Sequence, residues 1–301
     1  MSIGVPTRNR PNELNRLLCQ LRNQTYSHLE IIVSNNASDD FLVEQVALRH
    51  IQNDTRIKYL KTDTLVSAGR NHTICLNAAH GEYFMWFHDD DEIDSRYVEA
   101  LVTILHSDTE VALVGGSCDR YKDGHFWYEY HTWDDRSKNK VERLMNLIKQ
   151  AYVDHASFEQ YTYGLFRLKH APKSFSQDFK AQFFLFFYFA ERGSLAHAAN
   201  ARMLKHTTEK EMQAHKDGLA YRRHCILSPF SDQGIHSIQQ CAPITLQMIS
   251  IIFHAQGISG LSKLFLINHC IWYFLRTGIA DEKQRLKRFL RSIRCTNSPS
   301  N

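Results

Sequence analysis

The stretch that decides the fold is YFMWFHDDDEID, residues 83–94, in which five apolar or aromatic residues and one histidine lead into three aspartates. An apolar run of this length, bounded by polar residues, predicts a strand that is buried on both faces of a sheet. The aspartates at 89–91 would repel one another unless a divalent cation or a cationic partner neutralised them. Ligands of open α/β sheets collect outside the carboxyl ends of strands, where these carboxylates would lie. The alternative is that the acidic residues only open a loop, with Asp94 or Ser95 capping the next helix.

Length and composition favour one larger domain with an appendage, because 301 residues with 43% hydrophobic side chains can bury a sizeable core. No signal peptide is predicted at the N-terminus. The seven cysteines are scattered and include no CxxC pair, which is typical of reduced thiols in a cytosolic protein rather than of disulfides or a zinc site. The net charge of +4, without an RNA- or DNA-binding motif, does not predict a nucleic-acid partner.

Strands and helices alternate through the first half of the chain. The expected strands lie at residues 2–6, 29–34 and 57–60 and in the run from Tyr83. The expected helices carry Leu14 to Leu21, Val43 to Ala47 and Ala68 to Ala79. Helices of this length between strands predict βαβ units and a parallel sheet, with the turns that follow the strands on one edge.

That edge carries groups suited to a nucleotide diphosphate. Amides and hydroxyls can bond a base and a ribose, and guanidinium groups can bond phosphate. Asn and Ser are also common in ordinary turns, so only their convergence favours a site. The absence of GxGxxG and GxxxxGK[ST] argues against a dinucleotide-binding dehydrogenase and a P-loop phosphotransferase. The edge residues are Thr7, Arg8, Asn9, Arg10, Asn35, Asn36, Arg70 and Asn71.

Three segments together resemble the successive signatures of family-2 glycosyltransferases with the GT-A fold. They are SIGVPTRNRP (2–11), LEIIVSNNASDD (29–40) and AGRNHTICLNAAHGEYFMWFHDDDEID (68–94). The resemblance implies an α/β fold with a Rossmann-like, mostly parallel central sheet flanked by helices. It further implies a catalytic domain at 1–207, with a nucleotide-sugar-binding half (1–115) and an acceptor-binding half (116–207), followed by a helical C-terminal region at 208–301.

The resemblance also assigns residues to the nucleotide-sugar site. Asn35 stands where the family commonly has Asp, and because an amide can donate a hydrogen bond, the base stays open although a UDP-sugar is favoured. The residues assigned are Pro6, Thr7 and Asn9 in the first loop, Asn35 and Asn36 for the base, Arg70 for base or phosphate, and Asp89 and Asp90 in the acidic loop.

Asp89 and Asp91 match the DXD motif that in this family holds a divalent ion, Mn²⁺ or Mg²⁺, on the diphosphate. Such an ion neutralises the charge that grows on the leaving phosphate oxygens. Asp91 is expected to bind the metal directly, Asp89 to reach the ribose or a metal-bound water, and Asp90 to point away. His206 resembles a family histidine that approaches the metal or the donor phosphates, although a lone His more often packs or caps.

An inverting transfer needs a base for the acceptor hydroxyl. Asp178 is the candidate, because it follows YGLFR at 163–167, which resembles the strand before the family's catalytic helix. The alternatives are that Asp178 is a helix N-cap and that Glu191 is the base.

The segment CDRYKDGHFWYEYHTWDD, residues 118–135, predicts a hairpin with a tight turn at Asp123 and Gly124. Its aromatic residues either stack on an acceptor sugar or form the core of a small sheet extension. They are Trp127, Tyr128, Tyr130 and Trp133.

Beyond residue 208 the pattern is helical, and charged or histidine residues interrupt the apolar segments 243–254 and 261–275, so no transmembrane helix is predicted. Residues 282–293 are amphipathic, and six cations lie between Lys283 and Arg294. This pattern predicts either an interfacial helix on anionic lipid or a helical subdomain or oligomer contact. Residues 295–301 are expected to be disordered.

These patterns favour an inverting, metal-dependent transfer of a sugar from a nucleotide-diphosphate donor to a glycan or lipid-linked acceptor, in surface polysaccharide or glycoconjugate synthesis. The expected location is the cytoplasm, with peripheral contact to the inner face of the cell membrane. The alternative is a nucleotide-sugar-binding protein without turnover. A metal-dependent phosphatase is less favoured, because its nucleophilic Asp would follow the first strand, where Pro6 and Thr7 stand.

Overall fold

The computed structural model describes residues 1–153, 163–172, 185, 187–207, 249 and 252–272. The chain divides into two compact units, one of residues 1–143 and 156–209 and the other of residues 144–155 and 210–301. The predicted domain boundaries at residues 115 and 207 stay predictions. Among the described residues, no helix combines the length and the apolar character that a membrane crossing requires.

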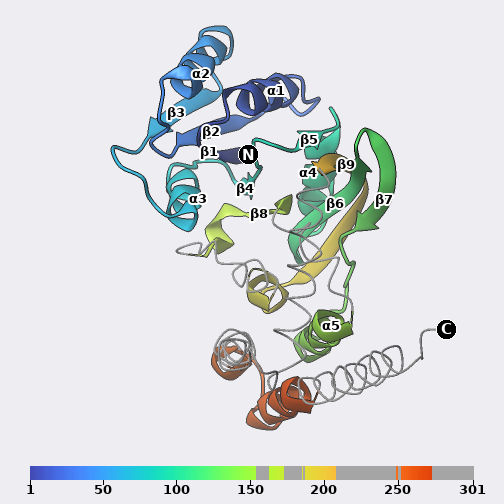
Figure 1. Ribbon diagram of the computed structural model, residues 1–301. Helices are drawn as coiled ribbons and strands as arrows, with labels where there is room; N and C mark the ends of the chain where they lie inside the picture. Colours follow the sequence, from blue (N-terminus) through green and yellow to red (C-terminus); the bar gives the residue numbers. More distant parts are fainter. Residues whose placement is uncertain (154–162, 173–184, 186, 208–248, 250–251, 273–301) are drawn as a thin grey trace, which may run out of the picture. The chain divides into compact units, whose positions relative to one another are not determined.

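Four parallel strands form the first part of the sheet, in the order β3-β2-β1-β4 (Figure 1). They are β1 (Ser2–Thr7), β2 (Glu30–Asn35), β3 (Ile57–Lys61) and β4 (Tyr83–Trp86). The connecting helices are α1 (Pro11–Arg22), α2 (Leu42–Asn53) and α3 (Ala68–Asn77). The predicted βαβ alternation and parallel pairing are confirmed for this part of the chain.

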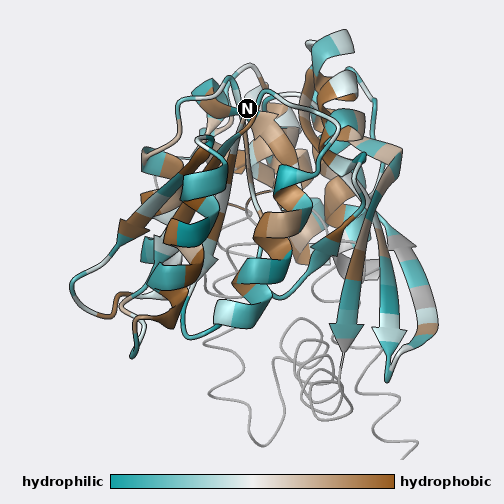
Figure 2. Ribbon diagram, turned by 90° about the horizontal axis from the view of Figure 1, so that it is seen from above, coloured by the Kyte–Doolittle hydropathy of each residue, from teal (hydrophilic) through white to brown (hydrophobic). Residues whose placement is uncertain are grey.

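Strand alternation decides which helix covers which face of this sheet. Ile3 and Val5 of β1 belong to the core cluster that also contains the buried leucines of α1. Gly4, between them, faces α3 so closely that a Cβ atom there would lie 2.6 Å from the Cβ of Cys75. Figure 1 shows α1 and α2 on one side of these strands and α3 on the other, and Figure 2 shows hydrophobic strands beneath helices whose outer faces are hydrophilic.

The strand predicted from the opening stretch is β4, and its burial on both faces is confirmed. Its side chains, and that of Phe87 after it, are at most 5% exposed. Met85 and Phe87 join the core cluster on the α1 side, whereas Phe84 and Trp86 pack near Gly4 on the α3 side. This burial fixes the exit point of the chain, so the acidic loop begins at the end of the sheet where β1 also ends.

The second part of the sheet is mixed, in the order β4-β8-β6-β9-β5, with β7 paired to β6. β8 is antiparallel to both β4 and β6, and β6 and β9 are parallel. The chain segments concerned are β5 (Glu92–Ile93), α4 (Tyr97–Ser107), β6 (Val111–Lys122), β7 (His125–His131), α5 (Lys140–Val153), β8 (Leu165–Arg167), a 3₁₀ turn (Leu168–His170) and β9 (Ser194–Thr207).

The predicted hairpin is confirmed as β6 and β7, which pair antiparallel. Both turn residues have positive φ, 50° at Asp123 and 80° at Gly124, as the two central residues of a type I′ turn require. Trp127 is 42% exposed, which leaves an acceptor contact open at this position. The side chains of Tyr128 and Tyr130 lie outside the described part of the structure.

Glu30 ties the start of three strands together. Its carboxylate accepts hydrogen bonds from Ser2 Oγ, Lys58 Nζ and the backbone N–H of His80. Burial opposes ionisation of Glu30, but these donors outweigh it and lower the pKa to about 2.

We expect the Glu30→Gln variant to lose part of the acid sensitivity of the wild type. A carboxyl with a depressed folded pKa contributes stability above its unfolded pKa of about 4.3, and this contribution disappears as the pH falls towards 2. Urea unfolding between pH 6 and pH 2.5 should therefore show a flatter pH dependence of the unfolding free energy in Glu30→Gln. Glu44→Gln, which removes the partner of Lys61 at 2.9 Å, is the control and should keep the wild-type slope. Equal slopes in Glu30→Gln and the wild type would contradict the assignment.

Candidate active site

The acidic loop is attached to the end of β1 by one buried hydrogen bond. Thr7 Oγ1 donates to Asp89 Oδ2 at 2.7 Å, and the two side chains belong to residues that are 4% and 3% exposed. The backbone N–H of Asn36 donates to the Thr7 carbonyl at 2.9 Å, so the end of β2 is joined at the same place. The segments that follow β1, β2 and β4 therefore meet at one edge of the sheet, as expected.

Arg10, at the N-terminus of α1, supplies positive charge to two of the three aspartates. Its Nη1 lies 3.0 Å from Asp89 Oδ1 and 2.7 Å from Asp90 Oδ2. Burial raises the pKa of Asp89 to about 6, although Thr7 and Arg10 act in the opposite direction. Arg10 is thus the principal counter-charge of a carboxylate that is almost inaccessible to water.

Asp91 is the most buried of the three aspartates, at 1% exposure. It accepts a hydrogen bond from the hydroxyl of Tyr163, and Lys205 Nζ lies 3.5 Å from its Oδ2. Burial raises the pKa of Asp91, and the charge of Lys205 opposes that effect. Asp91 therefore has partners from the segment before β8 and from β9, both in the second half of the sheet.

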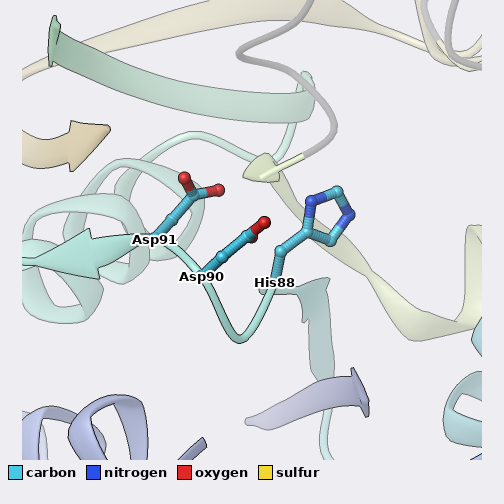
Figure 3. A group of neighbouring side chains, drawn as sticks. All are labelled: His88, Asp90 and Asp91. Carbon is cyan, nitrogen blue, oxygen red and sulfur yellow. The ribbon is translucent and has the colours of Figure 1, made fainter. Parts of the chain in front are cut away.

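His88, Asp90 and Asp91 offer one ligand atom each, and these atoms all lie within 4.8 Å of one another. Figure 3 shows the three side chains on the same side of the loop between β4 and β5. The Oδ1 atom of Asp90 is buried and has no hydrogen-bond partner among the described residues, although the side chain is 43% exposed. Ligands of one metal ion lie about 4 to 5 Å apart at most, since each bond is about 2.0–2.5 Å. The group therefore fits a divalent cation, with one carboxylate oxygen still lacking a donor.

His88 is in the form that a metal site requires. Burial and the charges of Lys205 and Arg10 lower the pKa of His88 to about 4, so its imidazole is neutral at pH 7. Its Nδ1 lies 2.9 Å from the Tyr163 hydroxyl, and its Nε2 lies 3.4 Å from Nε2 of His72. Burial lowers the pKa of His72 to about 3, and its Nδ1 lies 2.9 Å from the Ala68 carbonyl. Both imidazoles are therefore held neutral and oriented.

A pocket of about 420 Å³ opens beside these groups. Its size suits a small-molecule ligand, and its wall combines cationic, amide and carboxylate groups. Five of the residues predicted for the nucleotide-sugar site line it, and so do both arginines of the first loop. The lining residues are Pro6, Thr7, Arg8, Arg10, Asn36, Ala68, Asn71, His72, His88, Asp89 and Asp90.

The predicted amides near the pocket bond other parts of the protein. Asn35 Nδ2 donates to the Tyr59 hydroxyl at 2.9 Å, and its Oδ1 accepts from the Ser38 N–H at 3.1 Å. Asn36 bonds the backbone of Val66 through both ends of its amide, each at 2.9 Å. These amides fix the loops that shape the pocket, whether or not they also contact a base.

Two further predicted residues lie around the first loop and α3. Asn9, at a positive φ of 54°, accepts from the Asp39 N–H at 2.8 Å, which joins the first loop to the loop after β2. Arg70 is exposed in the first turn of α3 and is not among the residues that line the pocket, whereas its neighbour Asn71 is.

Three predictions made from the sequence alone have different outcomes here. The expectation that Asp90 points away is wrong, because its carboxylate lines the pocket and joins the candidate metal group. His206 is not in that group within the described residues, and its Nε2 lies 3.2 Å from Glu92 Oε1. Asp178 lies outside the described residues. Its competitor Glu191 forms ion pairs with Arg192 and Lys140.

The family model described as "Glycosyl transferase family 2" matches residues 2–184 of this sequence. The match includes every segment that builds the pocket and the acidic loop. The chain belongs to glycosyl transferase family 2.

This family-2 glycosyltransferase resembles several curated proteins over part of its length. It is 31% identical to the GalNAc(5)-diNAcBac-PP-undecaprenol beta-1,3-glucosyltransferase of Campylobacter jejuni over 178 residues, 54% of this chain and 56% of that one. It is 30% identical to the abequosyltransferase RfbV of Salmonella typhimurium over 41% of this chain and 37% of that protein. The matches thus span about half or less of these relatives.

The fold of this family-2 glycosyltransferase also matches solved structures. The crystal structure of S. aureus TarS 1-349 in complex with UDP-GlcNAc superposes with a TM-score of 0.62 at 13% identity, and the match covers 90% of this chain and 71% of that chain. The mixed sheet with helices on both faces is therefore the GT-A fold, and the prediction of family and fold class is confirmed.

Several groups around the acidic loop of this glycosyltransferase were not singled out from the sequence. His72 and Tyr163 lie within the segments 68–94 and 163–167 that resemble the family, and Lys205 directly precedes His206, but the sequence assigned no role to any of the three. His88 directly precedes the aspartates, so its position next to a candidate metal motif was a usable signal. Arg10 was recognised as an edge residue, but its pairing with Asp89 depends on how β1 and β4 lie side by side.

We expect Thr7→Val to destabilise the protein by about 1–3 kcal/mol, because it removes the donor that faces a buried carboxylate oxygen while keeping the side-chain volume. Urea unfolding at pH 7 measures this difference. Thr7→Ser keeps the hydroxyl and is the matched control, with a smaller loss. If Thr7→Val were as stable as the wild type, the hydrogen bond would not hold the loop.

Proposed function

We propose that this chain is an inverting, metal-dependent glycosyltransferase that moves a sugar from a nucleotide-diphosphate donor to a glycan or lipid-linked acceptor. The process it would serve is the synthesis of a surface polysaccharide or glycoconjugate. The observation that carries the proposal is the pocket at the ends of β1 and β4, in which two arginines, oriented amides and the acidic loop meet. A nucleotide diphosphate combines the base, ribose and phosphates that such groups bind.

The first loop supplies the residues that would bind the diphosphate. Arg8 and Arg10 line the pocket, and each side chain is more than a third exposed, so both can reach a ligand. Asn35, Asn36 and Arg70 are proposed for the base or its surroundings. A UDP-sugar is the favoured donor, which agrees with the UDP-GlcNAc bound by the TarS structure of the same fold.

The acidic loop would position the donor for departure of its diphosphate. Asp91, Asp90 and His88 are the residues that would hold Mn²⁺ or Mg²⁺, and such an ion supplies positive charge where the diphosphate leaves. Asp89, which Thr7 and Arg10 hold, is proposed to reach the ribose or a metal-bound water. Tyr163 holds Asp91 in place through its hydroxyl.

The acceptor side rests on sequence and on relatives. Asp178 is proposed as the base that takes the acceptor proton, and His206 is retained as a second candidate for the donor phosphates. The name of the Campylobacter jejuni relative specifies an acceptor linked to undecaprenol through a diphosphate, which favours a lipid-linked acceptor here.

A lipid-linked acceptor would place the enzyme at the cytoplasmic face of the membrane. The helix at 260–272 exposes large apolar side chains, Leu261 at 82%, Leu264 at 56% and Phe265 at 51%. The cations between Lys283 and Arg294, which lie outside the described residues, would complement anionic lipid.

Lipid binding is testable with vesicles. We expect the full chain to sediment with phosphatidylglycerol vesicles, and Leu264→Ser with Phe265→Ser to lower the bound fraction at least twofold, because apolar area that could enter the bilayer is lost. Leu48→Ser removes an apolar side chain that is 46% exposed on α2 and is the control. Equal binding of the double variant and the wild type would count against this surface.

The transfer itself is tested by incubating the full chain and Mn²⁺ with a panel of UDP- and GDP-sugars and with glycan or lipid-linked acceptors, and measuring release of the nucleoside diphosphate. We expect Asp91→Asn to lower turnover at least about 100-fold, because charge neutralisation at a leaving group contributes several kcal/mol. Asp94→Asn, an exposed residue in the same segment that keeps its capping oxygen, is the control and should retain activity.

The outcomes separate the two functions under consideration. Donor binding without turnover on any acceptor would favour a nucleotide-sugar-binding protein. Full activity of Asp91→Asn, or full activity in EDTA, would remove the metal from the proposal. The anomeric configuration of the product, measured by NMR, tests inversion.

A further inference from the structure

The ammonium group of Lys205 lies against the most buried aspartate of the acidic loop. Its Nζ is 3.5 Å from Asp91 Oδ2 and donates a hydrogen bond to the Tyr163 hydroxyl at 3.2 Å. The same atom lies 5.6 Å from the centroid of the Tyr163 ring, within cation–π distance. Lys205 is thus held by Tyr163 and by Asp91, and Asp91 is one of the three candidate metal ligands.

The contact with Lys205 compensates the negative charge of Asp91 in the protein without ligands. An ionised carboxylate that is 1% exposed is costly unless an opposite charge compensates it. Arg10 serves Asp89 and Asp90 through its Nη1, and the ion pair of Asp91 is with Lys205. The charge of Arg120 also acts on Asp91, although less strongly than that of Lys205, and Arg120 is itself buried at 4% exposure.

Lys205 differs from Arg120 in its access to solvent, and from both arginines in the compact charge that its side chain carries. Its side chain is 27% exposed, and a lysine carries a compact charge on a flexible four-carbon stem. A dication held by Asp91, Asp90 and His88 would meet this ammonium at close range. The two cations therefore compete for one carboxylate.

We propose that Lys205 is the internal counter-cation of Asp91 and weakens the binding of a divalent metal to the donor-free protein. The inference rests on the proposed function, because it concerns the metal site of the same transferase. Its consequence is that the site is stable without a metal and takes one up only when the ammonium is displaced.

The experiment is a Mn²⁺ titration of the full chain without nucleotide, with free Mn²⁺ followed by electron paramagnetic resonance. We expect Lys205→Met to bind Mn²⁺ at least about tenfold more tightly than the wild type, because a like charge within a few ångströms of the ion is removed. Lys205→Arg keeps the cation and should stay within about threefold of the wild type. Lys61→Met removes the same charge from β3, where Lys61 pairs with Glu44, and should leave the affinity unchanged.

A role of Lys205 in folding alone would give a different result. Lys205→Met should melt at a lower temperature than the wild type without Mn²⁺, and saturating Mn²⁺ should restore more of its melting temperature than it adds to the wild type. Unchanged or weaker Mn²⁺ binding in a folded Lys205→Met would overturn the inference while leaving the transferase proposal intact, provided that Asp91→Asn abolishes binding. Absence of Mn²⁺ binding in the wild type and in Lys205→Met would overturn both the inference and the metal dependence.

Discussion

The structure around the pocket depends on one constraint, which is that carboxylates removed from water need fixed counter-charges or donors. Asp89 and Asp91 are 3% and 1% exposed, and each would be costly to ionise alone. Thr7 and Arg10 compensate Asp89, and Tyr163 and Lys205 compensate Asp91. The partners of Asp89 come from the parallel part of the sheet and those of Asp91 from the mixed part. The acidic loop therefore joins the two parts chemically as well as through the chain.

The sheet makes this arrangement possible because it fixes where each strand ends. β1 and β4 are parallel neighbours, so Thr7 and Asp89 meet although 82 residues separate them in the chain. Full burial of Phe84 and Trp86 on one face and of Met85 and Phe87 on the other prevents β4 from sliding or turning. The close approach of α3 at Gly4 has the same effect on β1. Precise placement of the carboxylates thus follows from apolar packing several residues away.

The sequence predicted the elements of the first half closely, because alternating apolar strands and amphipathic helices are local patterns. It also predicted that Thr7, Asn36 and Asp89 lie on one edge, since that follows from parallel topology alone. It did not predict the direction of the Asp90 side chain, because three adjacent aspartates look alike until their partners are known. Tyr163 and Lys205 were beyond reach for a related reason. They approach Asp91 through antiparallel β8 and through β9, whose pairing with β6 is broken by register shifts.

The charges of this loop also explain why a strongly acidic motif can exist in a folded protein without its ligand. Arg10 and Lys205 compensate most of the negative charge, but Oδ1 of Asp90 has no hydrogen-bond partner among the described residues, and Asp89 keeps a raised pKa of about 6. The negative charge is therefore incompletely compensated at Asp89 and Asp90, which line the pocket. A ligand that brings a dication together with a diphosphate can satisfy these carboxylates and the pocket arginines at once, whereas either component alone satisfies only one sign of charge. For the proposed transferase, the residual imbalance would favour joint binding of metal and nucleotide over binding of either one.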